Sequence, residues 1–410
     1  MAPAGVRHVD TSLLFLAPPS KSVTYHTIKD AYQDTILSVL KKVAENKSPG
    51  VEDLCIAILC PFLHNHWTTP RSILYPQLQK LIACLYKLIV ITAAKESINL
   101  DIAGGIDAEV LIVVPSPGNE IAKDEDESLK TFGPIIPLRA LSSTRVWDRI
   151  FVAADAAALP ESQFSLEKRQ REGAEVIRLP GLDTDTWVQT PEDPVHTFSS
   201  QDRRKHYDVA VGGTFDHLHI GHKLLLTMFA LALDVPDSEQ RVRTLTVGIT
   251  GDALLKNKKY AEVLESWADR QKSVQGFLSG IVGFQERKEA ARNFRVEEQN
   301  EEGPNGHAVN VWLTDTLVIK CVEIWDPFGP TITDEKISAL VLSGETRSGG
   351  KAVNDKRTER GWPDLEVFEV DVLDTDEAQE TDAAEDFKNK ISSTELRRVQ
   401  VEKARGSSKF

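Results

Sequence analysis

The chain has 410 residues and a formal net charge of −14 at pH 7, and 41% of its residues are hydrophobic. This length favours two or three domains, each able to bury an apolar core. The acidic balance argues against a broad nucleic-acid-binding surface, because such a surface needs clustered positive charge to meet phosphates. It leaves room for a local basic pocket that binds a small anion.

Cysteine usage indicates a reducing compartment, so we expect the protein in the cytoplasm or the nucleus. The four cysteines are too sparse for a disulfide framework, and none lie in a CxxC pair. Cys60 with His64 and His66 could be drawn as a metal site, but no fourth ligand is near. We therefore interpret Cys60 as a buried thiol beside a polar turn and predict no protein-bound metal site.

Residues 1–180 are predicted to form an N-terminal α/β domain. The apolar run near the N-terminus is too short for a signal peptide, and the segment 78–94 has helical periodicity with two lysines, as in a core helix rather than a membrane span. The expected elements are a strand at 12–19, helices at 28–46 and 78–94, and strands at 108–115 and 149–153. This half has no glycine-rich phosphate loop and no nucleophile elbow, so its role stays unassigned.

Residues 181–205 are polar with two prolines and are predicted to be a linker to a second domain, 206–405. The elements expected there are strands at 207–212, 244–250, 309–313, 317–324 and 339–343, with helices at 221–233, 262–278 and near 334–339. This alternation predicts a parallel sheet with crossover helices. We expect a polar, mobile insert at 297–307, an acidic tether at 371–386 and a short basic helix after Lys390.

The segment GGTFDHLHIGH follows the first strand of the second domain directly. Gly212 and Gly213 allow the backbone to approach an anion, and Thr214 adds a hydroxyl donor. His219 and His222 are three residues apart, so at a helix start both rings can face one side. The helix start itself attracts phosphate through its N–H groups. The segment therefore predicts a phosphate site at the carboxyl end of a parallel strand.

Three further segments carry candidate residues. GDALLKNKK follows the next strand, and one lysine among Lys256, Lys258 and Lys259 is expected to neutralise a substrate phosphate. The segment 343–357 holds Arg347, Asn354 and Arg357 near two glycines, which fits phosphate binding or a charged helix start.

KISSTELR, residues 390–397, places Ser392 and Ser393 ahead of Glu395. This is a capping-box pattern, so the simplest interpretation is an ordinary helix cap without a ligand. The alternative is that the hydroxyls and the helix-start N–H groups bind the β- and γ-phosphates of a nucleotide.

Together these segments resemble the HxGH nucleotidyltransferase superfamily, and within it the eukaryotic, fungal-type phosphopantetheine adenylyltransferases. The resemblance covers about 206–405 and rests on five motifs in the family's order: VGGTFDHLHIGHK (211–223), GITGDALLKNK (248–258), DPFGP (326–330), SGETRSGGKAVNDKR and KISSTELR. It implies a Rossmann-like parallel-sheet domain that transfers an adenylyl group from ATP to 4′-phosphopantetheine, giving dephospho-coenzyme A and pyrophosphate. It also implies Mg²⁺ as cofactor.

The resemblance implies roles for individual residues. The catalytic set is His222, His219 and Lys256. The ATP-binding set is Gly212, Gly213, Thr214, Phe215, Gly221, His222, Arg347, Asn354, Ser392 and Ser393. The substrate-binding set is Thr214, Lys256, Lys258 and Arg357.

Three other functions are weighed against this one. An aminoacyl-tRNA synthetase would need a KMSKS loop after a long insertion, whereas this chain reads KISST. A cytidylyltransferase acting on a phosphorylated alcohol shares the histidines, but SGETRSGGKAVN and KISS fit adenylyl transfer better. A non-catalytic scaffold of the coenzyme A pathway is the third, and the N-terminal half is a hypothetical contact for other enzymes of that pathway. A GxxxxGK[ST] kinase loop is absent, so a separate kinase is expected to follow.

Overall fold

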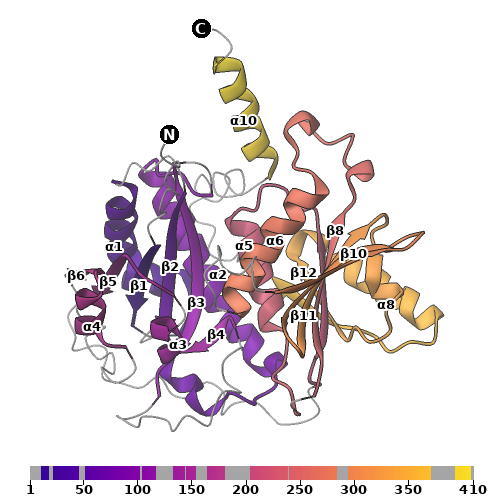
Figure 1. The fold of residues 1–410 in the computed structure, drawn as a ribbon, viewed down its shortest axis with the longest axis horizontal. Helices are drawn as coiled ribbons and strands as arrows, with labels where there is room; N and C mark the ends of the chain where they lie inside the picture. Colours follow the sequence, from indigo (N-terminus) through magenta and orange to yellow (C-terminus); the bar gives the residue numbers. More distant parts are fainter. Residues whose placement is uncertain are drawn as a thin grey trace, which may run out of the picture. The chain divides into compact units, whose positions relative to one another are not determined.

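The computed structural model divides the chain into two compact units (Figure 1). The first comprises Met1–His66, Cys84–Lys130 and Ile135–Pro194, and the second comprises Trp67–Ala83, Thr131–Pro134 and Val195–Phe410. The structure describes residues 11–17, 22–45, 51–101, 104–116, 133–143, 145–153, 164–180, 204–238, 240–283, 294–370 and 393–407. The described residues do not include 181–203 of the predicted linker or any part of the predicted tether 371–386.

The first unit contains a six-stranded, all-parallel sheet of order β4-β3-β2-β1-β5-β6. Its strands are β1 (Thr11–Leu16), β2 (Glu52–Leu59), β3 (Ile106–Val114), β4 (Ile135–Pro137), β5 (Arg149–Ala153) and β6 (Glu175–Leu179). Most are nearly continuous apolar runs, which is what strands covered on both faces require. The order reverses beside β1, so this half, which was predicted only as an α/β domain, has a Rossmann-like arrangement.

Among the described residues up to 180, the α-helices are α1 (Tyr25–Ala44), α2 (Arg71–Lys95), α3 (Leu138–Ser143) and α4 (Leu166–Arg171). A capping box between Thr24 and Thr27 starts α1. Among the described residues, α2 is the one helix long and apolar enough to cross a membrane, but 67% of its most apolar window is buried within the protein. That degree of burial is what a core helix requires. The boundary between the two units falls within α2, after Ala83.

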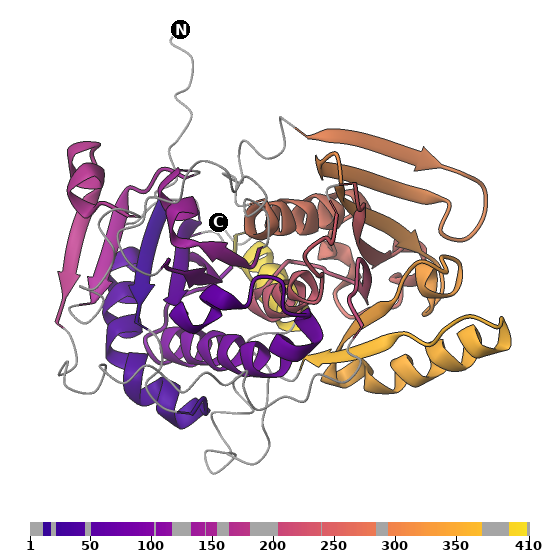
Figure 2. The same ribbon diagram turned by 90° about the horizontal axis from the view of Figure 1, so that it is seen from below.

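The second unit contains a seven-stranded sheet of order β13-β12-β7-β8-β11-β10-β9. Its strands are β7 (Asp208–Gly213), β8 (Arg243–Thr250), β9 (Arg295–Asn300), β10 (His307–Thr314), β11 (Leu317–Ile324), β12 (Ala339–Ser343) and β13 (Glu366–Val370). Five strands run parallel, and β10 and β9 are added antiparallel at one edge (Figure 2).

The polar stretch 297–307 differs from the predicted insert. Its first residues lie in β9, which pairs with β10 along its whole length. Every residue of β9 is exposed, so the strand carries no buried apolar face. The predicted helix near 334–339 is also wrong: the residues before β12 are irregular, and a short 3₁₀ helix, η8, lies earlier, at Gly329–Ile332.

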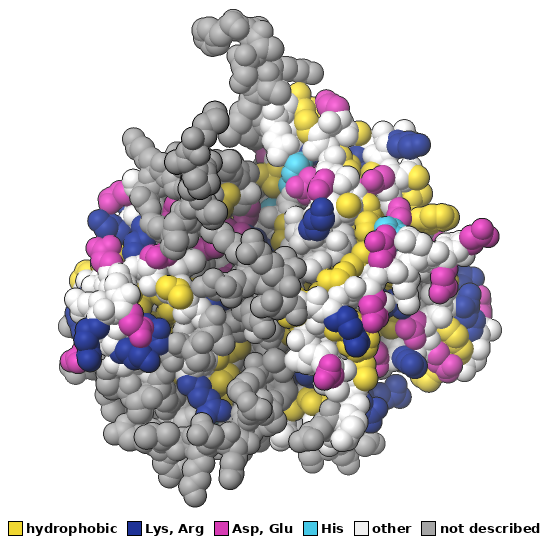
Figure 3. All heavy atoms as spheres, viewed as in Figure 1, with side chains coloured by type: hydrophobic (Ala, Val, Ile, Leu, Met, Phe, Trp, Pro, Cys, Tyr) yellow, Lys and Arg dark blue, Asp and Glu magenta, His cyan; other side chains and the backbone are white. Residues whose placement is uncertain are grey.

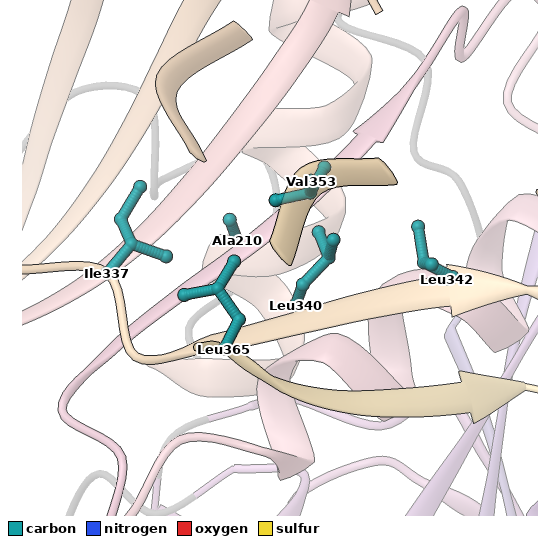
Figure 4. Close-up of a cluster of buried hydrophobic side chains, with 6 residues drawn as sticks. All are labelled: Ala210, Ile337, Leu340, Leu342, Val353 and Leu365. Carbon is teal, nitrogen blue, oxygen red and sulfur yellow. The ribbon is translucent and has the colours of Figure 1, made fainter. Parts of the chain in front are cut away.

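Helices cover both faces of the second sheet. Figure 1 shows α5 (Ile220–Leu231) and α6 (Trp267–Val282) on one face and α8 (Arg347–Glu359) on the other. A buried apolar cluster joins α8 to the sheet (Figure 4), and its members are Ala210, Ile337, Leu340, Leu342, Val353 and Leu365.

The strand order of the second sheet fixes where a ligand can bind. The strands that follow β7 in the chain, β8 to β11, all lie on one side of it. The last two strands, β12 and β13, lie on its other side. In such sheets the crevice for ligands lies at the carboxyl ends of the strands, where the order reverses. The loop after β7 lies at this switch point.

Candidate phosphate-binding site

The loop from β7 to α5 places two histidines against each other. His219 is the N-cap residue of α5, but its side chain makes no capping hydrogen bond. Its ring stacks on the ring of His222, with centroids 3.9 Å apart and an angle of 23° between the planes. His219 Nε2 lies 3.3 Å from the Oγ of Ser393, the first residue of α10 (Ser393–Ser407). The site is thus formed by two helix starts that are 174 residues apart in the chain.

Each of these histidines keeps one ring nitrogen available. The Nδ1 atoms of His219 and His222 are buried and have no hydrogen-bond partner among the residues that the structure describes. A buried polar atom without a partner is costly, and at a functional site it indicates a group that a ligand completes.

Both histidines are uncharged near neutral pH. Burial lowers the pKa of His219 well below its usual value, and the neighbouring His222, Lys223 and His217 lower it further. Burial is also the main cause that lowers the pKa of His222 to about 3; Lys258 and His217 add to the effect and Glu265 opposes it. A phosphate anion beside the rings would favour the protonated form, so its binding would be coupled to proton uptake.

The glycines and the aromatic residue of this loop shape its backbone. A Cβ at Gly212 would meet open space, whereas one at Gly213 would lie 3.0 Å from the ring of Phe215. Phe215 has a φ of 52° and is fully buried, so its ring packs beneath the loop and lies 5.4 Å from the ring of His222. Gly221 lies in the first turn of α5, next to His222.

Among the three predicted lysines, Lys258 comes nearest to the loop after β7. Its Nζ lies 3.5 Å from the Oγ1 of Thr214. Lys259 contributes its carbonyl oxygen, which accepts a hydrogen bond from Arg397, and the side chain of Lys256 is exposed. On the face drawn in Figure 3, histidine side chains lie at the surface with acidic and basic side chains close by.

Asp216 and Arg397 dock the last helix onto this loop. The Oδ2 of Asp216 accepts a hydrogen bond from Arg397 Nη1 at 2.5 Å, and its Oδ1 accepts one from the Glu265 backbone N–H at 2.9 Å. Arg397 also donates to the carbonyl oxygen of Lys259 at 3.1 Å. The sequence motif contains Arg397, but its role in holding α10 was not predicted.

Arg270, on α6, is a second residue that sequence reasoning missed. Its side chain is fully buried and donates to the carbonyl oxygens of Thr214 and Thr250 at 2.6 Å and 2.8 Å. It also binds a carboxylate oxygen of Asp252 at 2.6 Å. Arg270 therefore connects the loops that follow β7 and β8.

The described residues hold one group of three side chains with metal-ligating atoms close together, Asp216, His217 and Glu265. This group is already paired internally. His217 Nε2 donates to the carbonyl oxygen of Val263, and Glu265 accepts the backbone N–H of His217. Asp216 is paired with Arg397, whose positive charge repels a cation. The group does not fit a dedicated metal cage, and Cys60, His64 and His66 form no such group.

Two residues predicted to bind ATP or substrate have side chains that form hydrogen bonds to the backbone. Asn354 donates to the carbonyl oxygen of Leu365 at 3.1 Å and accepts the N–H of Leu365 at 2.9 Å. Arg357 is 1% exposed, and its guanidinium makes five hydrogen bonds to carbonyl oxygens, those of Thr331, Asp334, Glu335, Ile337 and Pro363. With its five N–H groups used in this way, Arg357 cannot serve as the predicted phosphate ligand.

Arg347 begins α8, and its Nε donates to Glu369 on β13 at 2.5 Å. Ser392, which the motif places beside Ser393, lies outside the described residues. The structure therefore brings together His219, His222 and Ser393, with Thr214 and Lys258 as a second pair.

These features define an α/β protein with a Rossmann-like sheet and a histidine-lined candidate anion site at its switch point. The chain belongs to the phosphopantetheine adenylyltransferase family. A phosphopantetheine adenylyltransferase of Methanopyrus kandleri is 30% identical over 169 residues, which make up 41% of this chain and 81% of that protein. One from Saccharomyces cerevisiae is 34% identical over 199 residues, 48% of this chain and 50% of that protein.

Two further similarities concern proteins without an assigned role. An uncharacterized protein of Schizosaccharomyces pombe is 37% identical over 188 residues, 46% of each chain. Residues 1–178 match a family described as Domain of unknown function (DUF8446). The chain spans about half the length of the relatives from Schizosaccharomyces pombe and Saccharomyces cerevisiae.

Proposed function

We propose that this protein transfers the adenylyl group of ATP to 4′-phosphopantetheine. An oxygen of the acceptor phosphate attacks the α-phosphorus of ATP, and the bond to the β-phosphate breaks, so that dephospho-coenzyme A and pyrophosphate form. The observation that carries the proposal is the stacked pair of His219 and His222, with unpartnered Nδ1 atoms and with Ser393 beside it.

The residues divide into two groups in this reaction. His219, His222 and Ser393 would hold the triphosphate and stabilise the charge that develops on the leaving pyrophosphate. Thr214 and Lys258 would hold the acceptor phosphate, since Lys258 Nζ and Thr214 Oγ1 lie 3.5 Å apart on the loops that follow β7 and β8. A general base is not required because the attacking phosphate is already an anion, so positioning and charge stabilisation suffice.

Mg²⁺ would enter with ATP rather than occupy a cage made by the protein. The carboxylates of Asp216 and Glu265 are already paired with Arg397 and His217. Mg²⁺ commonly binds through substrate phosphates and water with few protein ligands. Chelation by EDTA should therefore stop transfer without lowering the thermal stability of the free protein.

The test is to incubate the purified protein with Mg²⁺, ATP and 4′-phosphopantetheine and to follow dephospho-coenzyme A and pyrophosphate by mass spectrometry. A parallel reaction holds CTP with phosphocholine or phosphoethanolamine. Product in the first reaction, and its loss in a folded His222→Asn variant, would support the proposal. Product only in the second would assign the protein to cytidylyl transfer, and no product in either would favour a non-catalytic role.

A further inference from the structure

The buried guanidinium of Arg270 joins the two loops that carry the proposed acceptor-binding groups. Thr214 is the first residue after β7, and its carbonyl oxygen accepts from Nη1 at 2.6 Å. Thr250 ends β8, and Asp252 lies two residues further on; both accept from Nη2. Nε donates to the carbonyl oxygen of Glu265 at 3.1 Å, just ahead of α6.

This bonding lies beside the contact between Thr214 and Lys258, the two residues that the proposed function assigns to the acceptor phosphate. The loop after β8 continues from Asp252 to Lys258, whose Nζ lies 3.5 Å from the hydroxyl of Thr214. A guanidinium is planar and presents its donors in a fixed fork, so it holds its acceptors at a set separation. A lysine ammonium has three donors on one compact, rotatable group and no planar fork, so it would not hold these acceptors at the same separation.

Other contacts hold the same two loops less directly. The hydroxyl of Thr250 donates to the carbonyl oxygen of Gly213 at 3.2 Å, and the second carboxylate oxygen of Asp252 accepts the N–H of Trp267. The contact between Arg270 and Asp252 lies at the protein surface, because the Asp252 side chain is 54% exposed. Arg270 therefore supplies the buried, charge-assisted part of the connection.

We propose that Arg270 is a positioning residue for the acceptor phosphate, setting the separation between the Thr214 hydroxyl and the Lys258 ammonium. This inference rests on the proposed function, and it adds a residue that contacts neither substrate. It predicts a selective effect: the acceptor site is disturbed, while the triphosphate site at His219 and His222 is not.

The experiment compares Arg270→Lys and Asp252→Ala with the wild-type chain. Asp252→Ala is a milder change at an exposed carboxylate, so it tests the connection even if Arg270→Lys folds poorly. Arg243→Lys is the matched control, because Arg243 is also buried and lies at the opposite, amino end of β8. Thermal unfolding establishes that each variant is folded. Calorimetry then gives the Kd of 4′-phosphopantetheine without ATP, and steady-state kinetics give KM for both substrates.

For Arg270→Lys we expect kcat/KM for the acceptor to fall by about 10- to 100-fold, since a displacement of about 1 Å can have this effect. The Kd of 4′-phosphopantetheine should rise with it, and KM for ATP should stay near the wild-type value. Asp252→Ala should show the same pattern with a smaller loss, and Arg243→Lys should behave as wild type.

Unchanged acceptor binding in both variants would overturn the inference, and so would equal losses for ATP and the acceptor. A wild-type chain that neither binds nor converts 4′-phosphopantetheine would instead overturn the proposed function, and this inference with it.

Discussion

The carboxylate of Asp216 and the guanidinium of Arg397 form an ion pair inside the second unit, although 181 residues separate them in the chain. Their side chains are 0% and 2% exposed. Removing one member of such a pair leaves an uncompensated buried charge. This pair therefore ties the loop that carries the histidines to the helix that carries Ser393.

Arg397→Met should lower the free energy of unfolding by about 3–5 kcal/mol, because it leaves Asp216 buried without its positive partner. The measurement is urea denaturation at pH 7. Arg398→Met is the matched control on the same helix: Arg398 is 42% exposed and pairs with Glu395 and Glu402, so its loss should cost less than about 1 kcal/mol. Equal losses in the two variants would contradict this account of the buried pair.

Lys258→Met should raise KM for 4′-phosphopantetheine by about 10- to 100-fold, since a hydrogen bond to a charged group contributes about 1.5–3 kcal/mol. Lys256→Met removes the same charge from the same loop and serves as the control. A larger effect of Lys256→Met would reverse the assignment drawn from the Lys258–Thr214 distance. Initial rates at saturating ATP are the measurement.

Ser393→Ala should raise KM for ATP roughly fivefold, because the variant loses one hydrogen bond at the triphosphate site. KM for the acceptor should not change and provides the internal control. If both constants rise together, Ser393 acts through the packing of α10 rather than through the nucleotide.

The stability of the protein should fall as the pH drops from about 6.5 towards 3. The pKa of His222 is lowered to about 3 in the folded protein, whereas an unperturbed histidine titrates near 6.5. Between these values the unfolded chain binds a proton that the folded site does not, so one such histidine reduces stability by up to about 1.4 kcal/mol per pH unit. Above pH 6.5 the imidazole is neutral in both states and the effect disappears.

His222→Asn removes this titrating group, so its free energy of unfolding should depend less steeply on pH than that of the wild type. Chemical denaturation at pH 7 and pH 5 measures the difference. Parallel pH profiles for the two proteins would argue against a strongly lowered pKa at this position.

The strand-to-helix junction at 212–222 could be predicted because its signal is local. A short apolar run ends in glycines, and polar residues with phosphate-binding side chains follow directly. The parallel sheet and the switch point follow from the alternation of such units. The separation between His219 and Ser393 could not be derived this way, because it depends on how α10 packs.

The supporting arginines gave no recognisable sequence signal. Arg270 stands in a helix among polar residues, where a charged side chain usually faces solvent. Its acceptors are mostly carbonyl oxygens, which every residue possesses, so no partner residue marks it. The prediction that Arg357 binds substrate was wrong for the same reason. Nothing in the sequence marks the five carbonyl oxygens that its guanidinium binds.

Strand β9 was missed for the opposite reason. A strand is recognised by alternating apolar residues, and β9 is exposed along its whole length. Pairing with β10 through backbone groups needs no such pattern.

Because α10 docks onto the loop after β7, the site is completed by the last helix that the structure describes. The residues from Asp208 to Val370 contain every strand of the second sheet, whereas α10 begins at Ser393, so all of the strands are synthesised before α10. The nucleotide site gains its hydroxyl and its Arg397 anchor only afterwards. A nonsense mutation between these points would yield a chain with the sheet and both histidines but with one wall of the site missing.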